Sequence, residues 1–155
     1  MNLDLLKEEL IRYEGRKKAV YLDSLGLKTA GVGHLMIGAD RELPVGHTIA
    51  DSVIDIWFDA DILRSTHIAR SCVKNFDQLD DARQRILTQL AFNMGNRLLG
   101  FKKTLALIEQ NKFTEAADEL QNSKWFTQVG RRGPETCYAL RTGYYGWRPA
   151  QNPTT

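Results

Sequence analysis

A long run of helical periodicity in the middle of the chain constrains the fold most. Beyond Thr48, the apolar residues trace one long amphipathic α-helix of about six turns. These residues are Ile49, Val53, Ile56, Trp57, Ile62, Ile68 and Val73. A chain of 155 residues can bury one ordinary core but not two large ones. The long helix is therefore expected to link two lobes of a single domain.

The residues before this helix predict a helix and then a small sheet. Apolar positions in 3–13 form an amphipathic stripe that ends at Glu14-Gly15, and glycine favours the end of a helix. Short apolar runs follow at 19–21 and 30–32, with turn-forming residues between them, as expected for an antiparallel hairpin or meander. Gly31 and Gly33 flank Val32, which indicates a bulge or a close backbone approach.

The remainder of the chain is expected to be helical. Periodicity predicts helices over about 80–96, 103–110, 114–121 and 134–141, with Thr114 as an N-cap and Pro134 in a first turn. The fold class is thus α+β and mainly α, in the order helix, small antiparallel sheet, long helix, helical lobe. A cleft between the sheet and that lobe is the natural binding place.

Composition excludes several functional classes. The net charge is +2 and basic residues are mixed with acidic ones, which argues against a nucleic-acid-binding domain.

The N-terminal residues lack the pattern of a signal peptide. No apolar stretch reaches the roughly 18–20 residues of a membrane span, so we expect a cytoplasmic product without stable membrane insertion. Cys72 and Cys137 are too few for a disulfide framework and are expected to be free, buried thiols.

Two carboxylates stand where glycosidic-bond hydrolysis could use them. That reaction needs a protonated acid for the leaving oxygen and an ionised carboxylate to activate water or stabilise positive charge. Glu14 ends the first helix and Asp23 ends the first strand, so the hairpin could bring them together. Thr29 offers a hydroxyl that can hold a water. Taken alone, Glu14 could equally be a solvated charge, and Asp23 could serve only the turn.

The complete string around these residues resembles a known catalytic signature. Glu14-Gly15-x7-Asp23-x2-Gly26-x2-Thr29-x-Gly31-x-Gly33-His34 is similar, without a gap, to the signature of the phage-type, T-even-phage-like lysozymes of glycoside hydrolase family twenty-four. The resemblance continues at 91–95, 100–101, 115–117, 123–126 and 141–143. The region between His34 and the long helix is shorter than in the T-even-phage lysozymes.

The resemblance implies a single lysozyme domain over 1–155. Its β lobe would comprise 15–47, its helical lobe 1–14 and 75–155, and its connecting helix 48–74. It implies hydrolysis of the β-1,4 bond between N-acetylmuramic acid and N-acetylglucosamine in peptidoglycan. Glu14 would be the general acid, Asp23 the base or charge stabiliser, and Thr29 the holder of the attacking water, with inversion at the anomeric carbon. No cofactor or metal is implied.

Further site residues carry over from the family pattern. By this pattern His34 would pair with Asp61 in a structural ion pair. The alternative, a metal ligand, would need partners that His47 and His67 are not spaced to supply. Arg132 would lie beside Glu14, although it and Arg131 could instead form a solvated basic turn. The positions that would line the sugar groove are Leu35, Phe92, Thr104 and Glu119. Phe92 has the alternative of a core residue.

The resemblance also implies a biological setting. A bacteriophage endolysin would accumulate as a monomer in the host cytoplasm. It would reach the cell wall after a holin-like protein permeabilises the membrane, and so lyse the host. Two alternatives stay open on the same fold: a lytic transglycosylase, which does not require Asp23, and a protein that binds peptidoglycan without cutting it.

Overall fold

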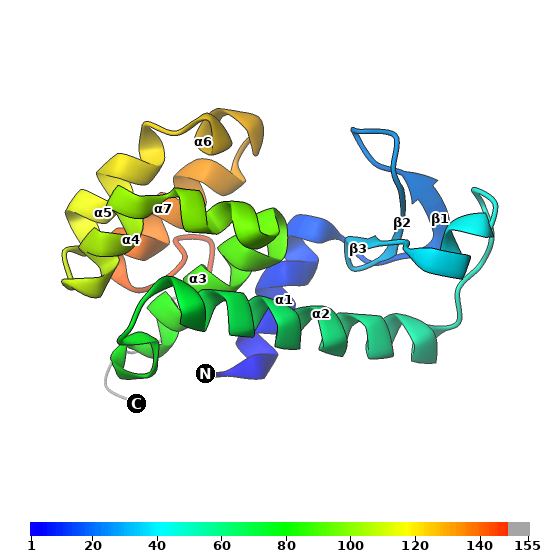
Figure 1. The fold of residues 1–155 in the computed structure, drawn as a ribbon, viewed down its shortest axis with the longest axis horizontal. Helices are drawn as coiled ribbons and strands as arrows, with labels where there is room; N and C mark the ends of the chain where they lie inside the picture. The colour runs from blue at the N-terminus through cyan, green and yellow to red at the C-terminus, as the bar shows by residue number, and fades with distance from the viewer. Residues whose placement is uncertain (149–155) are drawn as a thin grey trace. The chain divides into compact units, whose positions relative to one another are not determined.

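A small antiparallel sheet follows the first helix of the computed structural model, which describes residues 1–148 (Figure 1). Helix α1 (Leu3–Glu14) ends where Gly15 adopts a φ of 74° and donates its N–H to the Ile11 carbonyl at 2.8 Å. The strands β1 (Lys17–Leu22), β2 (Lys28–Gly31) and β3 (His34–Leu35) pair in that order. The predicted order of helix and antiparallel sheet is confirmed.

Strand β1 changes its partner along its length. Lys17 lies opposite Gly31 and Tyr21 opposite Thr29, so β1 carries two more residues than β2 between these pairs. The bulged residues pair instead with residues 46–49: Val20 donates its N–H to the His47 carbonyl at 3.0 Å, and Gly46 donates to the Val20 carbonyl at 2.8 Å. Bulges of this kind redirect side chains and are common beside active sites.

The sheet packs on the start of α2 (Asp51–Cys72) through a small apolar core. Its members are Val20, Ala30, Met36, Ile49 and Ile54, with Leu43 and Trp57 against them. Two ion pairs, Arg16 with Asp55 at 3.1 Å and Lys18 with Asp51 at 3.1 Å, add contacts between the hairpin and the helix. A short 3₁₀ helix, η1 (Gly38–Glu42), stands between β3 and α2.

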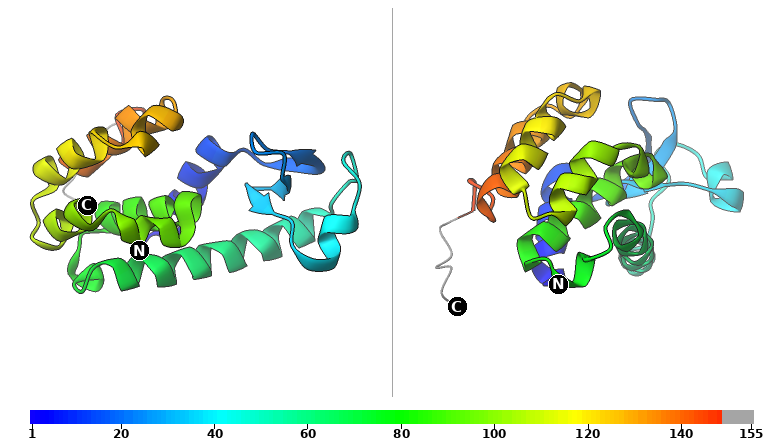
Figure 2. Two further views of the ribbon diagram at one scale, coloured as in Figure 1. Left: turned by 45° about the horizontal axis from the view of Figure 1, so that its top comes forward. Right: turned by 60° about the vertical axis from the view of Figure 1, so that its left-hand side comes forward.

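The rest of the described chain is helical. It comprises η2 (Phe76–Gln78), α3 (Asp81–Met94), η3 (Gly95–Gly100), α4 (Lys102–Glu109), α5 (Phe113–Gln121), α6 (Lys124–Gln128) and α7 (Arg132–Thr142). Helix α3 is buried along most of its length, and α5 lies against both α4 and α7 (Figure 2). The structure has the predicted lysozyme-like α+β class, mainly helical with one small sheet.

The chain divides into two compact units. One contains 3–64, and the other contains 1–2 and 65–155, of which residues up to 148 are described. Helix α1 therefore groups with the sheet, whereas the sequence analysis assigned 1–14 to the helical lobe. One reason is local, because Lys7 on α1 pairs with Asp59 on α2 at 2.8 Å and lies over the Phe58 ring. The predicted division into lobes stays a proposal.

The predicted helix starts and ends agree with the structure to within a few residues, with one wrong cap. Thr114 was expected to cap its helix, but α5 begins at Phe113 after Lys112, so Thr114 lies inside the first turn. Asp80 and Ser123 are N-caps whose side chains accept from Arg83 and Phe126 N–H groups. Within residues 1–148, no helix combines the length and apolar character that a membrane span requires.

Candidate active site

Glu14 is the last residue of α1, and the backbone of the β2–β3 turn lies against its carboxylate. A Cβ on Gly33 would be 2.8 Å from Glu14 Oε2 and 3.2 Å from Glu14 Cβ. Gly33 also has a φ of 58°, a conformation that other residues adopt only with strain. The close approach that the glycine spacing predicted is therefore present, and it is made to Glu14.

Asp23 holds the β1–β2 turn with one of its two carboxylate oxygens. Its Oδ1 accepts hydrogen bonds from the N–H groups of Leu25 at 2.8 Å and Leu27 at 2.9 Å. The turn interpretation of this residue is thus correct, and it fixes the direction of the side chain. Within residues 1–148, no group donates a hydrogen bond to Oδ2. That oxygen is available to accept from a water or a substrate.

Thr29 lies on β2 and is buried, with 5 % of its surface exposed. Its Oγ1 donates to the Leu27 carbonyl at 3.0 Å, so the hydroxyl proton is already engaged. The lone pairs of a hydroxyl oxygen remain acceptors in that arrangement. Thr29 can therefore receive a hydrogen bond from a water.

Tyr21 is a site residue that the sequence analysis missed. Burial raises the pKa of its phenol above 10.0, and the charges of Glu14 and Asp23 raise that pKa further. The phenol therefore lies within the electrostatic field of both candidate carboxylates. Tyr21 also pairs directly with Thr29 across the sheet. A signal was present in its spacing of two residues from Asp23, because alternate strand residues share a face.

His34 and Asp61 are brought together beside this group. His34 Nδ1 lies 2.6 Å from Asp61 Oδ2, and both side chains are largely buried. The imidazole stacks on the Trp57 ring with centroids 4.3 Å apart. Arg64 adds a hydrogen bond from its exposed guanidinium to Asp61 Oδ1 at 2.8 Å. These contacts join β3 to α2 and thereby support the strand that follows Gly33.

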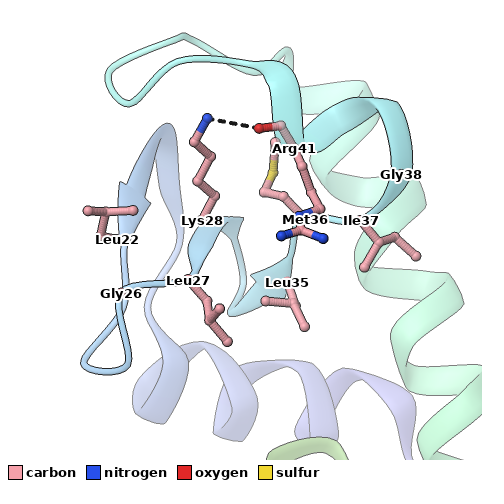
Figure 3. A pocket seen from close by; sticks show the side chains of 9 residues that line it. All are labelled: Leu22, Gly26, Leu27, Lys28, Leu35, Met36, Ile37, Gly38 and Arg41. Atoms are coloured by element: carbon pink, nitrogen blue, oxygen red, sulfur yellow. Dashed lines mark hydrogen bonds between the residues drawn. The ribbon is translucent and has the colours of Figure 1, made fainter.

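An apolar groove of about 380 Å³ opens beside the sheet (Figure 3). Its lining residues are Leu22, Gly26, Leu27, Lys28, Leu35, Met36, Ile37, Gly38 and Arg41. Lys28 supports the groove by donating from Nζ to the carbonyls of Arg41 and Leu43, at 2.8 Å each. Leu35, a predicted sugar-groove residue, is nearly half exposed here and pairs with Thr29.

The other predicted groove residues belong to the second compact unit. Phe92 is half-buried on α3, and Thr104 is buried on α4. Glu119 on α5 pairs with Lys103 at 2.9 Å, and Arg132, the first residue of α7, is buried. The pairing of Arg132 with Glu14 and the sugar-binding roles of these residues stay predictions.

The first unit thus gathers two carboxylates, a threonine hydroxyl and a phenol around one end of a small sheet. Within the described range 1–148, no group of three or more His, Cys, Asp or Glu residues could hold a metal ion. The arrangement is of the kind that acid–base chemistry on a bound polymer requires.

The fold defines the class, which is that of the lysozyme-like α+β proteins. Comparison with known proteins identifies the family. The chain matches the phage lysozyme family over residues 11–140, which covers most of its length, and it belongs to that family. Members of this family act on peptidoglycan as muramidase-like hydrolases.

Two similar proteins are also described as lysozymes. Probable T4-type lysozyme 2 of Dictyostelium discoideum is 32 % identical, covering 89 % of this chain and 94 % of the relative. Probable T4-type lysozyme 1 of the same organism is 30 % identical, covering 88 % of this chain and 94 % of the relative. The chain is similar to both over nearly their whole length.

Proposed function

We propose that this protein is an N-acetylmuramidase that hydrolyses the β-1,4 bond after N-acetylmuramic acid in peptidoglycan, with inversion at the anomeric carbon. The observation that carries the proposal is the division of hydrogen bonds at Asp23. One oxygen is held by the turn, while the other is available to a water that Thr29 can also hold. Membership of the phage lysozyme family supports the assignment.

The mechanism starts from the attacking water. The water donates one hydrogen bond to Thr29 Oγ1 and another to Asp23 Oδ2, which leaves an oxygen lone pair for the anomeric carbon. As the C–O bond forms, the glycosidic C–O bond breaks and the leaving oxygen takes the proton of Glu14. Asp23 accepts the proton that the water loses. Water and leaving group lie on opposite faces of the sugar, as inversion requires.

Gly33 has a part in this proposal because it restricts Glu14. A general acid must stay within hydrogen-bond reach of the oxygen that it protonates. The backbone packed on the Glu14 carboxylate limits the rotamers open to the side chain. Leu35 would contact the sugar from β3, and Phe92, Thr104 and Glu119 would complete the sugar groove. Arg132 would lie beside Glu14.

The setting that we propose is host-cell lysis by a bacteriophage endolysin. The protein would act as a monomer. It would accumulate in the host cytoplasm and reach the cell wall after a holin-like protein has permeabilised the membrane. Expression in a bacterial host with and without a membrane-permeabilising agent tests this order. Lysis only after permeabilisation is expected, and lysis without the agent would contradict the dependence on a holin.

The decisive experiment follows the turbidity and the product masses of purified peptidoglycan digested by the wild type, Glu14→Gln and Asp23→Asn. We expect products with reducing-end muramic acid that disappear in Glu14→Gln and fall strongly in Asp23→Asn. Lys124→Gln, an exposed change in the other unit, is the control and should cleave at the wild-type rate.

Three results would contradict the proposal. Anhydro-muramic products would make the protein a lytic transglycosylase. Binding of peptidoglycan by folded wild type without any cleavage would make it a binding protein on a lysozyme scaffold. Proton NMR of the fresh products reads the anomer, and a retained β-anomer would overturn the inverting mechanism.

A further inference from the structure

Tyr21 is a polar side chain of the candidate site to which the mechanism above assigns no task. It is half-buried near the end of β1, so part of its ring remains accessible. Its cross-strand partner is Thr29, whose partner on the next strand is Leu35. Directly paired residues on neighbouring strands point to the same face of a sheet. Tyr21, Thr29 and Leu35 therefore form one row across all three strands.

The bulge in β1 places a cation beside this row. Lys17 lies opposite Gly31, and the bulge leaves it on the same side of the sheet as Tyr21. The Lys17 ammonium lies 4.2 Å from the centroid of the Tyr21 ring, within the range of a cation–π contact. Lys17 thus restrains the ring without occupying its hydroxyl.

The Tyr21 hydroxyl has no hydrogen-bond partner in residues 1–148. A partly buried phenol usually engages its O–H with a neighbouring polar group. This one instead lies in the field of two carboxylates, which disfavours loss of its proton. It therefore remains a hydrogen-bond donor at every pH at which a lysozyme would work.

We infer that Tyr21 is a substrate-contacting residue, whose hydroxyl donates a hydrogen bond to an oxygen of the N-acetylated sugar placed over the row Tyr21, Thr29 and Leu35. The inference rests on the proposed function and adds a residue to its substrate site. Thr29 and Asp23 hold the water on one side of that sugar, and Leu35 gives it an apolar surface. Tyr21 supplies the donor that fixes the orientation of the sugar.

The test compares Tyr21→Phe with the wild type on a soluble, uncrosslinked peptidoglycan glycan. Removing one neutral hydrogen bond costs a factor of about three to ten in affinity. We expect the dissociation constant for the glycan, measured in a Glu14→Gln background, and the KM in the active protein to rise by about that factor. The midpoint of thermal unfolding should stay unchanged. Tyr144→Phe, at an exposed tyrosine of the other unit, is the matched control and should alter neither the dissociation constant nor the KM.

The outcomes separate this inference from the muramidase assignment. Wild type that cleaves the glycan, with Tyr21→Phe showing the same KM and dissociation constant, overturns the role of Tyr21 and leaves the muramidase intact. A lower unfolding midpoint with unchanged glycan affinity also overturns it, because the hydroxyl would then be structural. Wild type that binds but does not cleave contradicts the muramidase, while weaker binding by Tyr21→Phe would still support the contact.

Discussion

The α-carbon of Gly33 lies so close to the Glu14 carboxylate that a methyl group added to it would be 2.8 Å from Oε2. Substituting Gly33→Ala should therefore displace the proposed general acid. A misplacement of about 1 Å can cost on the order of 10²-fold in rate, so we expect kcat to fall by at least about tenfold. Initial rates of glycan cleavage measure the effect.

The matched control for Gly33→Ala is Gly130→Ala. Both glycines have a φ of 58°, but a Cβ on Gly130 would meet nothing within 4 Å. Each substitution should cost about 1–2 kcal/mol of stability from the left-handed backbone. Gly130→Ala should retain kcat. If both variants lost kcat to the same extent, backbone strain rather than the contact with Glu14 would be responsible.

Asp61 should contribute more to stability than its exposed arginine partner. Asp61→Asn removes the carboxylate charge whose Oδ2 lies 2.6 Å from Nδ1 of the largely buried His34 ring. A buried group left poorly paired costs about 1–3 kcal/mol. Arg64→Gln removes only the exposed partner of the same carboxylate and should cost no more than about 1 kcal/mol. Urea unfolding of the two variants measures both values, and equal losses would contradict the difference.

Cys137 should make stability fall at alkaline pH. Burial raises the pKa of its thiol from 9.0 to about 11, so the unfolded chain loses this proton before the folded protein does. The contribution of this thiol to the free energy of unfolding is therefore at its full value below pH 9. It decreases as the pH rises from 9 to 11. The decrease should be up to about 1.4 kcal/mol per pH unit. Cys137→Ala should remove this component of the pH dependence, which urea unfolding at pH 8, 9, 10 and 11 would measure.

Arg83 should not tolerate replacement by lysine. Its Nε and Nη2 donate to the Leu140 carbonyl at 3.0 and 2.8 Å, and Nη2 also donates to the Arg141 carbonyl. These carbonyls lie at the end of α7, and the guanidinium stacks over the Phe113 ring. A lysine cannot reproduce that planar fork, so we expect Arg83→Lys to lose about 1.5–3 kcal/mol.

Arg70→Lys is the control for Arg83→Lys. Arg70 is exposed and pairs with exposed Asp77 at 3.1 Å. Thermal unfolding should show a change within about 0.5 kcal/mol. A loss at Arg70 as large as that at Arg83 would mean that the carbonyl contacts at α7 contribute little.

Periodicity predicted the helices and the sheet because each has a strong repeat or a glycine at its end. The stripe of residues 3–13 and the run beyond Thr48 are examples, and α1 and α2 follow them. Thr114 was wrong as a cap because capping depends on the backbone angles of one residue, which composition does not specify. The five-residue helix α6 has too few turns to show a repeat of its own, and only the family resemblance indicated it.

The candidate site was less accessible to sequence reasoning. Glu14, Asp23 and Thr29 stood out through their spacing within a family signature, while Tyr21 appeared as an ordinary apolar strand residue. Its relation to Thr29 depends on the bulge in β1, which adds residues to one strand and so alters the register. No local sequence pattern predicts this change of register, because the bulged residues form hydrogen bonds with residues 46–49, far along the chain.

The exchange of partners along β1 also bears on how this protein can change in length. Residues 46–49 are bonded to Val20 and Lys18 by three backbone hydrogen bonds, so one inserted residue there would reverse which side chains face inward. The tip at Ser24 and Leu25 is exposed and would accommodate extra residues provided that the two N–H groups bonded to Asp23 are kept. Homologues and engineered variants are therefore expected to accept insertions at the hairpin tip and to reject them at residues 46–49.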